Sequence, residues 1–171
     1  MFAAYESQID QGSNATAANT YINALIKNVI AEPSSGSKAL SAFIAGTGNV
    51  LLAYESDALN AFATGQKIQI VQPAQNLLIQ NPAALTTTGS TNKAAVAFYD
   101  FIFSKAGQQI WLAQHFRPTL ASLQPTSRTT FYTPNKLNTI TGLGGWAKVT
   151  PKFFSPTGII TQAESANGYT S

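Results

Sequence analysis

The sequence contains no cysteine, and His115 is its single histidine. The absence of cysteine excludes a disulfide framework, a thiolate zinc site and a cysteine nucleophile. One histidine cannot form a histidine-based metal site or a histidine relay without carboxylates, and Asp and Glu together number only 7. We therefore expect neither a metal nor another cofactor in this protein.

Charged side chains are also scarce, at 10% of the 171 residues, where about a quarter is usual. The 10 lysines and arginines are scattered and form no run or stripe. Because nucleic-acid binding needs clustered basic side chains that displace counterions, the sequence argues against a nucleic-acid partner. A polar surface with so few charges is common among exported proteins.

Long apolar runs are missing as well. No segment approaches the ~18 apolar residues of a membrane-spanning helix, and no signal peptide is recognisable. Hydrophobic residues nevertheless make up 44% of the chain, which is enough for a real core. Because the first residues read like the middle of a helix, we expect a truncated chain.

Helical periodicity and capping residues predict helices at 1–11, 15–30, 35–45, 55–64 and 91–115, the last broken near Gly107. An apolar run at 50–54 and an alternating run at 67–71 are typical of strands, and with the helix between them they predict a βαβ unit. We expect 73–88 to be extended and the chain after Pro118 to be irregular, as in a tail that wraps another lobe. The fold class is therefore α/β, helix-rich with short strands.

Serines cluster where the helix at 35–45 should begin. The segment Ser34-Ser35-Gly36-Ser37-Lys38 offers free backbone N–H groups and hydroxyl donors, which favour an anion. The simpler interpretation is a serine cap at Ser35 or Ser37. The spacing Ser35-x-x-Lys38 also matches penicillin-binding enzymes, but no Ser-Asp-Asn, Lys-Thr-Gly or Gly-x-Ser-x-Gly motif accompanies it. A Ser-Lys hydrolase is therefore a minor alternative.

A second polar group, Tyr54-Glu55-Ser56-Asp57, directly follows the first expected strand. Ligands in open α/β sheets bind at the carboxyl ends of strands, so Tyr54 is a candidate hydroxyl donor. Glu55 and Asp57 are more simply explained as acidic residues in the first turn of a helix. Arg117 could pair with an anion, although a buried ion pair or a carbonyl clamp is commoner. Other aromatic residues suit packing better than a binding cage: Trp111, Trp146, Phe153 and Phe154.

Several motifs then follow one another along the chain: Gly46-Thr47-Gly48-Asn49-Val50-Leu51-Leu52-Ala53-Tyr54-Glu55-Ser56-Asp57-Ala58, Gly107-Gln108-Gln109-Ile110, Phe116-Arg117-Pro118, and Gly144-Gly145-Trp146-Ala147-Lys148 before Phe153-Phe154. The first resembles the segment Gly-x-Gly-Asp-Val-Leu-x-x-Trp-Glu-Asn-Glu-Ala of the sulfate-binding proteins that serve ABC transporters. The others resemble that family's Gly-Gln-x-Ile helix, Arg-Pro motif and Gly-Gly-Trp segment. The matches are spread over about residues 2–160.

The resemblance implies a partial bilobal periplasmic-binding-protein type II fold, with most of lobe 2 and the C-terminal part of lobe 1. Residues 1–72 would form part of lobe 2, residues 73–88 the extended hinge crossing, and residues 89–171 the lobe 1 helices and wrapping tail. It implies transport and not catalysis: the protein would bind sulfate or a related oxyanion in the interlobe cleft and deliver it to a membrane permease. Its location would be periplasmic or extracellular, membrane-associated in Gram-positive hosts.

The resemblance also implies site residues. The family's Ser-Gly-Ala-Arg turn is similar to Ser35-Gly36-Ser37-Lys38, which makes the backbone N–H of Ser37 the implied donor, with Ser35 or Gly36 as alternates. The position of the family's indole donor is taken by Tyr54, whose phenol donates from a different place. The family's Ser-Gly-Gly loop and first-lobe donors have no counterpart here. We therefore expect this chain alone to bind sulfate weakly or not at all, and to self-associate through exposed surface. A non-binding structural domain is the remaining alternative.

Overall fold

The computed structural model describes residues 1–124 and 131–169. They form two compact units, each made of segments that are distant in the sequence. The first, which we call the terminal unit, consists of Met1–Ile30, Gln72–Gln80 and Pro134–Ser171. The second, the middle unit, consists of Ala31–Val71 and Asn81–Thr133.

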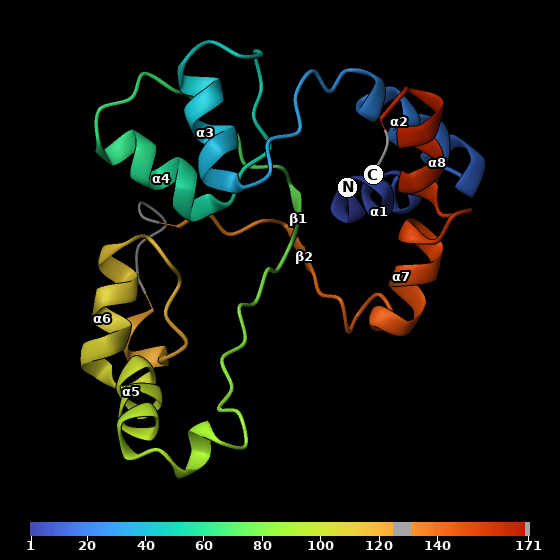
Figure 1. Ribbon diagram of the computed structural model, residues 1–171. Coiled ribbons are helices and arrows are strands. Elements are labelled where there is room, and N and C mark those ends of the chain that lie inside the picture. Colours follow the sequence, from blue (N-terminus) through green and yellow to red (C-terminus); the bar gives the residue numbers. More distant parts are fainter. Residues whose placement is uncertain (125–130, 170–171) are drawn as a thin grey trace. The chain divides into compact units, whose positions relative to one another are not determined.

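Both units are rich in helices (Figure 1). The terminal unit contains α1 (Phe2–Asp10), α2 (Ala15–Lys27), β1 (Gln75–Leu77), β2 (Lys136–Asn138), α7 (Trp146–Phe154) and α8 (Ile159–Ala166). The middle unit contains α3 (Gly36–Ile44), α4 (Glu55–Ala63), the short 3-10 helix η1 (Gly89–Thr91), α5 (Lys93–Phe103), α6 (Lys105–Ala113) and the 3-10 helix η2 (Ala121–Leu123). In the described ranges, none of these helices has the length and apolarity needed to cross a membrane.

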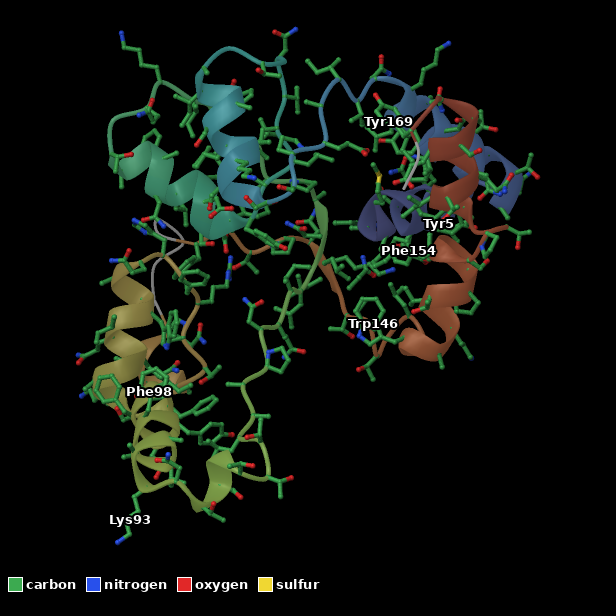
Figure 2. All side chains as sticks on the ribbon, viewed as in Figure 1. Tyr5, Lys93, Phe98, Trp146, Phe154 and Tyr169 are labelled. Carbon is green, nitrogen blue, oxygen red and sulfur yellow. The ribbon has the colours of Figure 1, made fainter. Side chains whose placement is uncertain are left out.

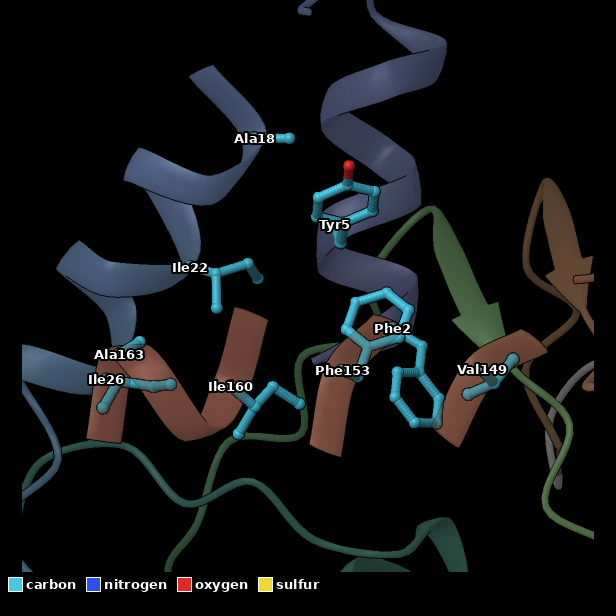
Figure 3. Close-up of a cluster of buried hydrophobic side chains, with 9 residues drawn as sticks. All are labelled: Phe2, Tyr5, Ala18, Ile22, Ile26, Val149, Phe153, Ile160 and Ala163. Atoms are coloured by element: carbon cyan, nitrogen blue, oxygen red, sulfur yellow. The ribbon is translucent and has the colours of Figure 1, made fainter. Parts of the chain in front are cut away.

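The core of the terminal unit is built by α1, α2, α7 and α8 (Figure 3). In α2 the helical period places Ala18, Ile22 and Ile26 on one buried face. The ring of Phe153 in α7, only 1% exposed, lies 4.8 Å from the ring of Phe2 in α1. The two ends of the chain therefore share one hydrophobic core.

A short parallel sheet adds to the terminal unit. β1 pairs with β2 in a register that joins Gln75 to Lys136 and Leu77 to Asn138. The ammonium of Lys136 forms an ion pair with Asp10 at the end of α1. The hydrogen bond from Lys136, together with one from Gln75, lowers the pKa of the Asp10 carboxyl from its ordinary value. Polar side chains of both strands thus tie the sheet to α1.

The middle unit consists mainly of two helix pairs, in which α3 packs on α4 and α5 packs on α6. Ser104 ends α5, and its hydroxyl caps α6 by accepting a hydrogen bond from the Gly107 N–H at 3.2 Å. A Cβ atom at Gly107 would lie 2.1 Å from the Phe101 carbonyl oxygen, so this tight corner requires glycine. The helices confirm the predicted stretch at 91–115, and the predicted break near Gly107 lies at Ser104.

The structure confirms the other predicted helices as α1 to α4 but not the predicted strands. Neither 50–54 nor 67–71 forms a strand, so the βαβ unit is wrong. Val50 and Leu52 are 81% and 68% exposed, so the apolar run is not buried. A strand is stable only beside a hydrogen-bonded partner, and the described residues supply none for these segments. One of the two observed strands, β1, lies inside 73–88.

The prediction of an irregular chain after Pro118 is also wrong, because this part contains β2, α7 and α8. Proline usually interrupts a helix interior, yet α7 continues through Pro151. Val149 and Phe153, on either side of the proline, are both buried in the core of the terminal unit. Tertiary packing thus holds a helix that the local sequence disfavours. The predicted class, helix-rich with short strands, is confirmed.

Candidate functional site

The first half of the candidate site is the start of α3. Ser35 caps this helix, and its hydroxyl accepts a hydrogen bond from the Lys38 N–H at 3.2 Å. The first backbone hydrogen bond inside the helix runs from the Ala39 N–H to the Ser35 carbonyl at 3.0 Å. The N–H groups of Gly36 and Ser37 therefore have no acceptor within the helix. Both residues are exposed, so these donors open onto the surface of the middle unit.

The second half is the start of α4. Tyr54 occupies the cap position in an extended conformation, its side chain makes no capping hydrogen bond, and it is 57% exposed. A Cβ atom at Gly36 would lie 3.7 Å from two carbons of the Tyr54 ring and 3.1 Å from Oδ2 of Asp57. The Tyr54 ring therefore lies against the first residue of α3. The structure brings Ser35, Gly36 and Ser37 together with Tyr54, and we call this set the α3–α4 cradle.

Arg117 is attached to the first turn of α4. Its Nε donates to Oε2 of Glu55 at 2.6 Å and its Nη2 donates to Oε1 at 2.7 Å, which is a bidentate ion pair. Nη2 also donates to the Tyr132 carbonyl, and the guanidinium lies 4.8 Å from the centre of the buried Phe131 ring. Of the sequence interpretations of Arg117, the ion pair and the carbonyl clamp are observed. The pair is partly exposed, with the two side chains 40% and 23% accessible.

The chain reaches Arg117 through a tight turn at the end of α6. The Phe116 N–H donates to the Trp111 carbonyl and the His115 N–H donates to the Leu112 carbonyl, both at 3.0 Å. The rings of Trp111 and Phe116 meet edge to face at 5.6 Å. These are the bonds and the hydrophobic contact of a Schellman motif. His115 has a φ of +62°, the left-handed conformation that this motif requires and that usually selects glycine.

Replacing His115 with glycine should raise the free energy of unfolding by about 1 kcal/mol, because glycine adopts the left-handed conformation without a Cβ penalty. Chemical denaturation followed by circular dichroism measures the change. The matched control is Gln114→Gly, since Gln114 has a φ of −97° and gains nothing from glycine there. A loss of stability in the His115 variant would mean that the imidazole contributes more than the backbone strain costs.

The residues of the alternative Ser-Lys site have other partners. The Lys38 ammonium donates to the Ser34 hydroxyl at 3.1 Å, whereas the Ser35 hydroxyl accepts from the Lys38 backbone. Ser35 and Lys38 thus do not form the nucleophile and base of a hydrolase in this arrangement. No group of three or more His, Asp or Glu side chains in the described part of the chain is placed to hold a metal ion.

Sequence reasoning missed two features of the site. One is the approach of Asp57 to Gly36, because the sequence around Asp57 is fully explained by the first turn of its own helix. The other is the link between Glu55 and Arg117, which are 62 positions apart. Neither has a local sequence signal, since each depends on how separate segments pack in the middle unit.

Comparisons with known proteins agree on one family. A family model described as bacterial extracellular solute-binding protein matches residues 3–117. The sulfate-binding protein of Synechococcus elongatus is 30% identical over 168 residues, which cover 95% of this chain and 48% of that protein. The sulfate-binding protein of Escherichia coli is 26% identical over 168 residues, which cover 94% and 50%. The chain spans about half the length of the curated relatives that it matches.

A solved structure gives the same result. The sulfate-binding protein SubI from Mycobacterium tuberculosis matches with a TM-score of 0.80 and 35% sequence identity, over 90% of this chain and 54% of that chain. The fold is therefore a partial periplasmic-binding-protein fold. Since the family model covers well over half of the 171 residues, the chain belongs to the family of bacterial extracellular solute-binding proteins.

Proposed function

We propose that this chain belongs to the extracytoplasmic component of an ABC transporter that binds sulfate or a related oxyanion and delivers it to a membrane permease. The observation that carries the proposal is the α3–α4 cradle, where the open N–H groups of Gly36 and Ser37 lie beside Tyr54. The names of the similar proteins, all sulfate-binding, supply the ligand. On this proposal the protein acts in transport and not as an enzyme.

The chemistry of the cradle suits a fully ionised tetrahedral anion. Backbone N–H groups at a helix start and a phenol O–H can all donate hydrogen bonds to such an anion. Two helices begin here, and the positive ends of both helix dipoles favour negative charge. Gly36 has no side chain, which lets the Tyr54 ring lie close to the start of α3. We assign donor roles to the N–H of Ser37, with Ser35 and Gly36 as alternates, and to the Tyr54 hydroxyl.

The proposal includes the arrangement of the larger protein. Residues 1–72 belong to lobe 2, residues 73–88 to the hinge crossing and residues 89–171 to the lobe 1 helices and the tail. The location is periplasmic or extracellular, with membrane association in a Gram-positive host. The cradle supplies only part of the donors around the anion. We therefore expect weak binding by this chain alone, and self-association at high concentration.

A sulfate titration followed by amide NMR tests the site. The signals of Gly36 and Ser37 should shift with a dissociation constant on the order of millimolar, as few charge-assisted hydrogen bonds allow. Tyr54→Phe removes the hydroxyl and should weaken binding by about tenfold. Its matched control is Tyr99→Phe on α5, which loses a hydroxyl elsewhere in the middle unit and should bind like the wild type.

Chloride at equal ionic strength controls for screening. The site is wrong if sulfate shifts no amide of residues 35–38 beyond the chloride effect. Micromolar binding would instead contradict the proposal that this chain supplies part of the donors. Labelling of Ser35 by a fluorophosphonate would favour the hydrolase.

A further inference from the structure

Arg117 is not part of the cradle, but it is hydrogen-bonded to Glu55, the residue that follows Tyr54. Glu55 is the first residue of α4 and directly follows Tyr54. Its carboxylate accepts from both Nε and Nη2 of Arg117, at 2.6 and 2.7 Å. Holding both carboxylate oxygens fixes the direction in which the Glu55 side chain extends from the first turn of α4.

The guanidinium is itself held in place. Its Nη2 group donates to the Tyr132 carbonyl, and its Cζ atom lies over the ring of Phe131, 4.8 Å from the ring centre. Phe131 is only 5% exposed. A second link lies one turn farther along α4, where the Asn60 amide donates to the Gln114 carbonyl at 3.1 Å. Residues 114–117 are therefore hydrogen-bonded to α4 at two points. Figure 1 shows α6 ending close to α4.

The contact between Arg117 and Glu55 matters for anion binding because of the charges around the cradle. The first turn of α4 carries two carboxylates, Glu55 and Asp57, and Asp57 already approaches Gly36. A divalent anion bound at the cradle would be repelled by both. The opposite charge of Arg117, in direct contact, offsets one of them.

We propose that Arg117 is a positioning residue for anion binding, which acts by holding the Glu55 carboxylate and its negative charge away from the α3–α4 cradle. The inference rests on the proposed function of that cradle. On this proposal Arg117 acts through Glu55, to which its Nε and Nη2 groups donate, and not by contact with the anion. Its motif Arg117-Pro118 thus serves the site through a neighbouring acidic residue.

The test compares Arg117→Gln, Glu55→Gln and the double variant in the sulfate titration. Glutamine removes the charge and keeps an amide donor on a shorter, neutral side chain. Arg117→Gln should weaken sulfate binding by about tenfold, as expected for one uncompensated charge near a partly exposed site. The double variant has no carboxylate to hold, so its affinity should return to within about threefold of the wild type.

Two further measurements separate this role from others. The Nε–H signal of Arg117 should shift in Glu55→Gln but stay unmoved by sulfate in the wild type. Lys136→Ala removes an ion pair from the terminal unit and should bind sulfate like the wild type. If Arg117→Gln does not fold, Arg117→Lys retains the charge beside Glu55 and should stay within about threefold of the wild type.

The inference is overturned if the double variant stays as weak as Arg117→Gln, or if sulfate shifts the Arg117 Nε–H signal as strongly as the Ser37 amide. Either result would place Arg117 on the anion itself. It is also overturned if Arg117→Gln folds and binds like the wild type. No sulfate response in the wild type would instead contradict the proposed function, and the inference would fall with it.

Discussion

Replacing Ser37 with proline should weaken sulfate binding by about 10- to 100-fold, whereas Ser37→Ala should leave it nearly unchanged. Proline removes the backbone N–H that we assign as a donor, and one charge-assisted hydrogen bond is worth about 1.5–3 kcal/mol. Since about 1.4 kcal/mol is a factor of ten, the loss corresponds to that range. Alanine removes only the hydroxyl and retains the N–H.

The α3 helix should tolerate this proline. Ser37 is the second residue of α3, and its N–H has no acceptor inside the helix, so proline removes no helical hydrogen bond. Proline also restricts the residue before it, partly through that residue's Cβ, but Gly36 has none. The cap at Ser35 does not involve the Ser37 N–H either. Ser37→Pro therefore removes the proposed donor while it leaves α3 intact.

Amide NMR and circular dichroism decide the outcome. Ser37→Pro should retain the helix content of the wild type, while its remaining cradle amides should respond only at about 10- to 100-fold higher sulfate concentration. Ser37→Ala serves as the matched control at the same position. Wild-type affinity in Ser37→Pro would remove Ser37 as the donor and move the role to the N–H of Gly36 or Ser35.

The parts of the fold that the sequence predicts well are those fixed by local interactions. The period of Ala18, Ile22 and Ile26 together with the cap at Asn14 determines α2, and Asn14 indeed accepts from the Ala17 N–H at 2.9 Å. The predicted strands failed for the opposite reason. An apolar run such as 50–54 fits a strand, but whether it becomes one depends on a neighbouring strand that no local pattern specifies.

The candidate site shows the same division. The sequence predicts where both helices begin, α3 after Ser35 and α4 after Tyr54. The signals are local: a capping serine for α3 and acidic residues in the first turn for α4. That these two starts meet at Gly36 is a matter of how α3 packs on α4. The Glu55–Arg117 pair needs the Schellman turn at His115 to direct the chain back to α4. Local sequence thus supplies the donors, and packing decides which side chains control the charge around them.

The sequence does not predict α7, yet this helix should be essential for the stability of the terminal unit. Phe153 in α7 is 1% exposed, and its ring lies 4.8 Å from Phe2 and 5.4 Å from Tyr5. Replacing it with alanine should lower the free energy of unfolding by about 3–5 kcal/mol through lost burial and a cavity. Because whole domains are stable by only about 5–15 kcal/mol, the variant should leave the terminal unit barely folded.

The adjacent Phe154 provides the matched control. It is 48% exposed and meets Phe2 edge to face at 5.5 Å, so Phe154→Ala should cost only about 1 kcal/mol. Denaturation in a Trp111→Phe background leaves Trp146, which lies 6.5 Å from Phe2, as the fluorescent reporter of the terminal unit. Equally small losses of unfolding free energy in both variants would mean that residues 146–154 do not pack on α1. This part of the chain would then be the irregular tail that its prolines and glycines indicate. A large cost for Phe153 alone would show that the buried face of α7 overrides Pro151 and that the two ends of the chain fold together.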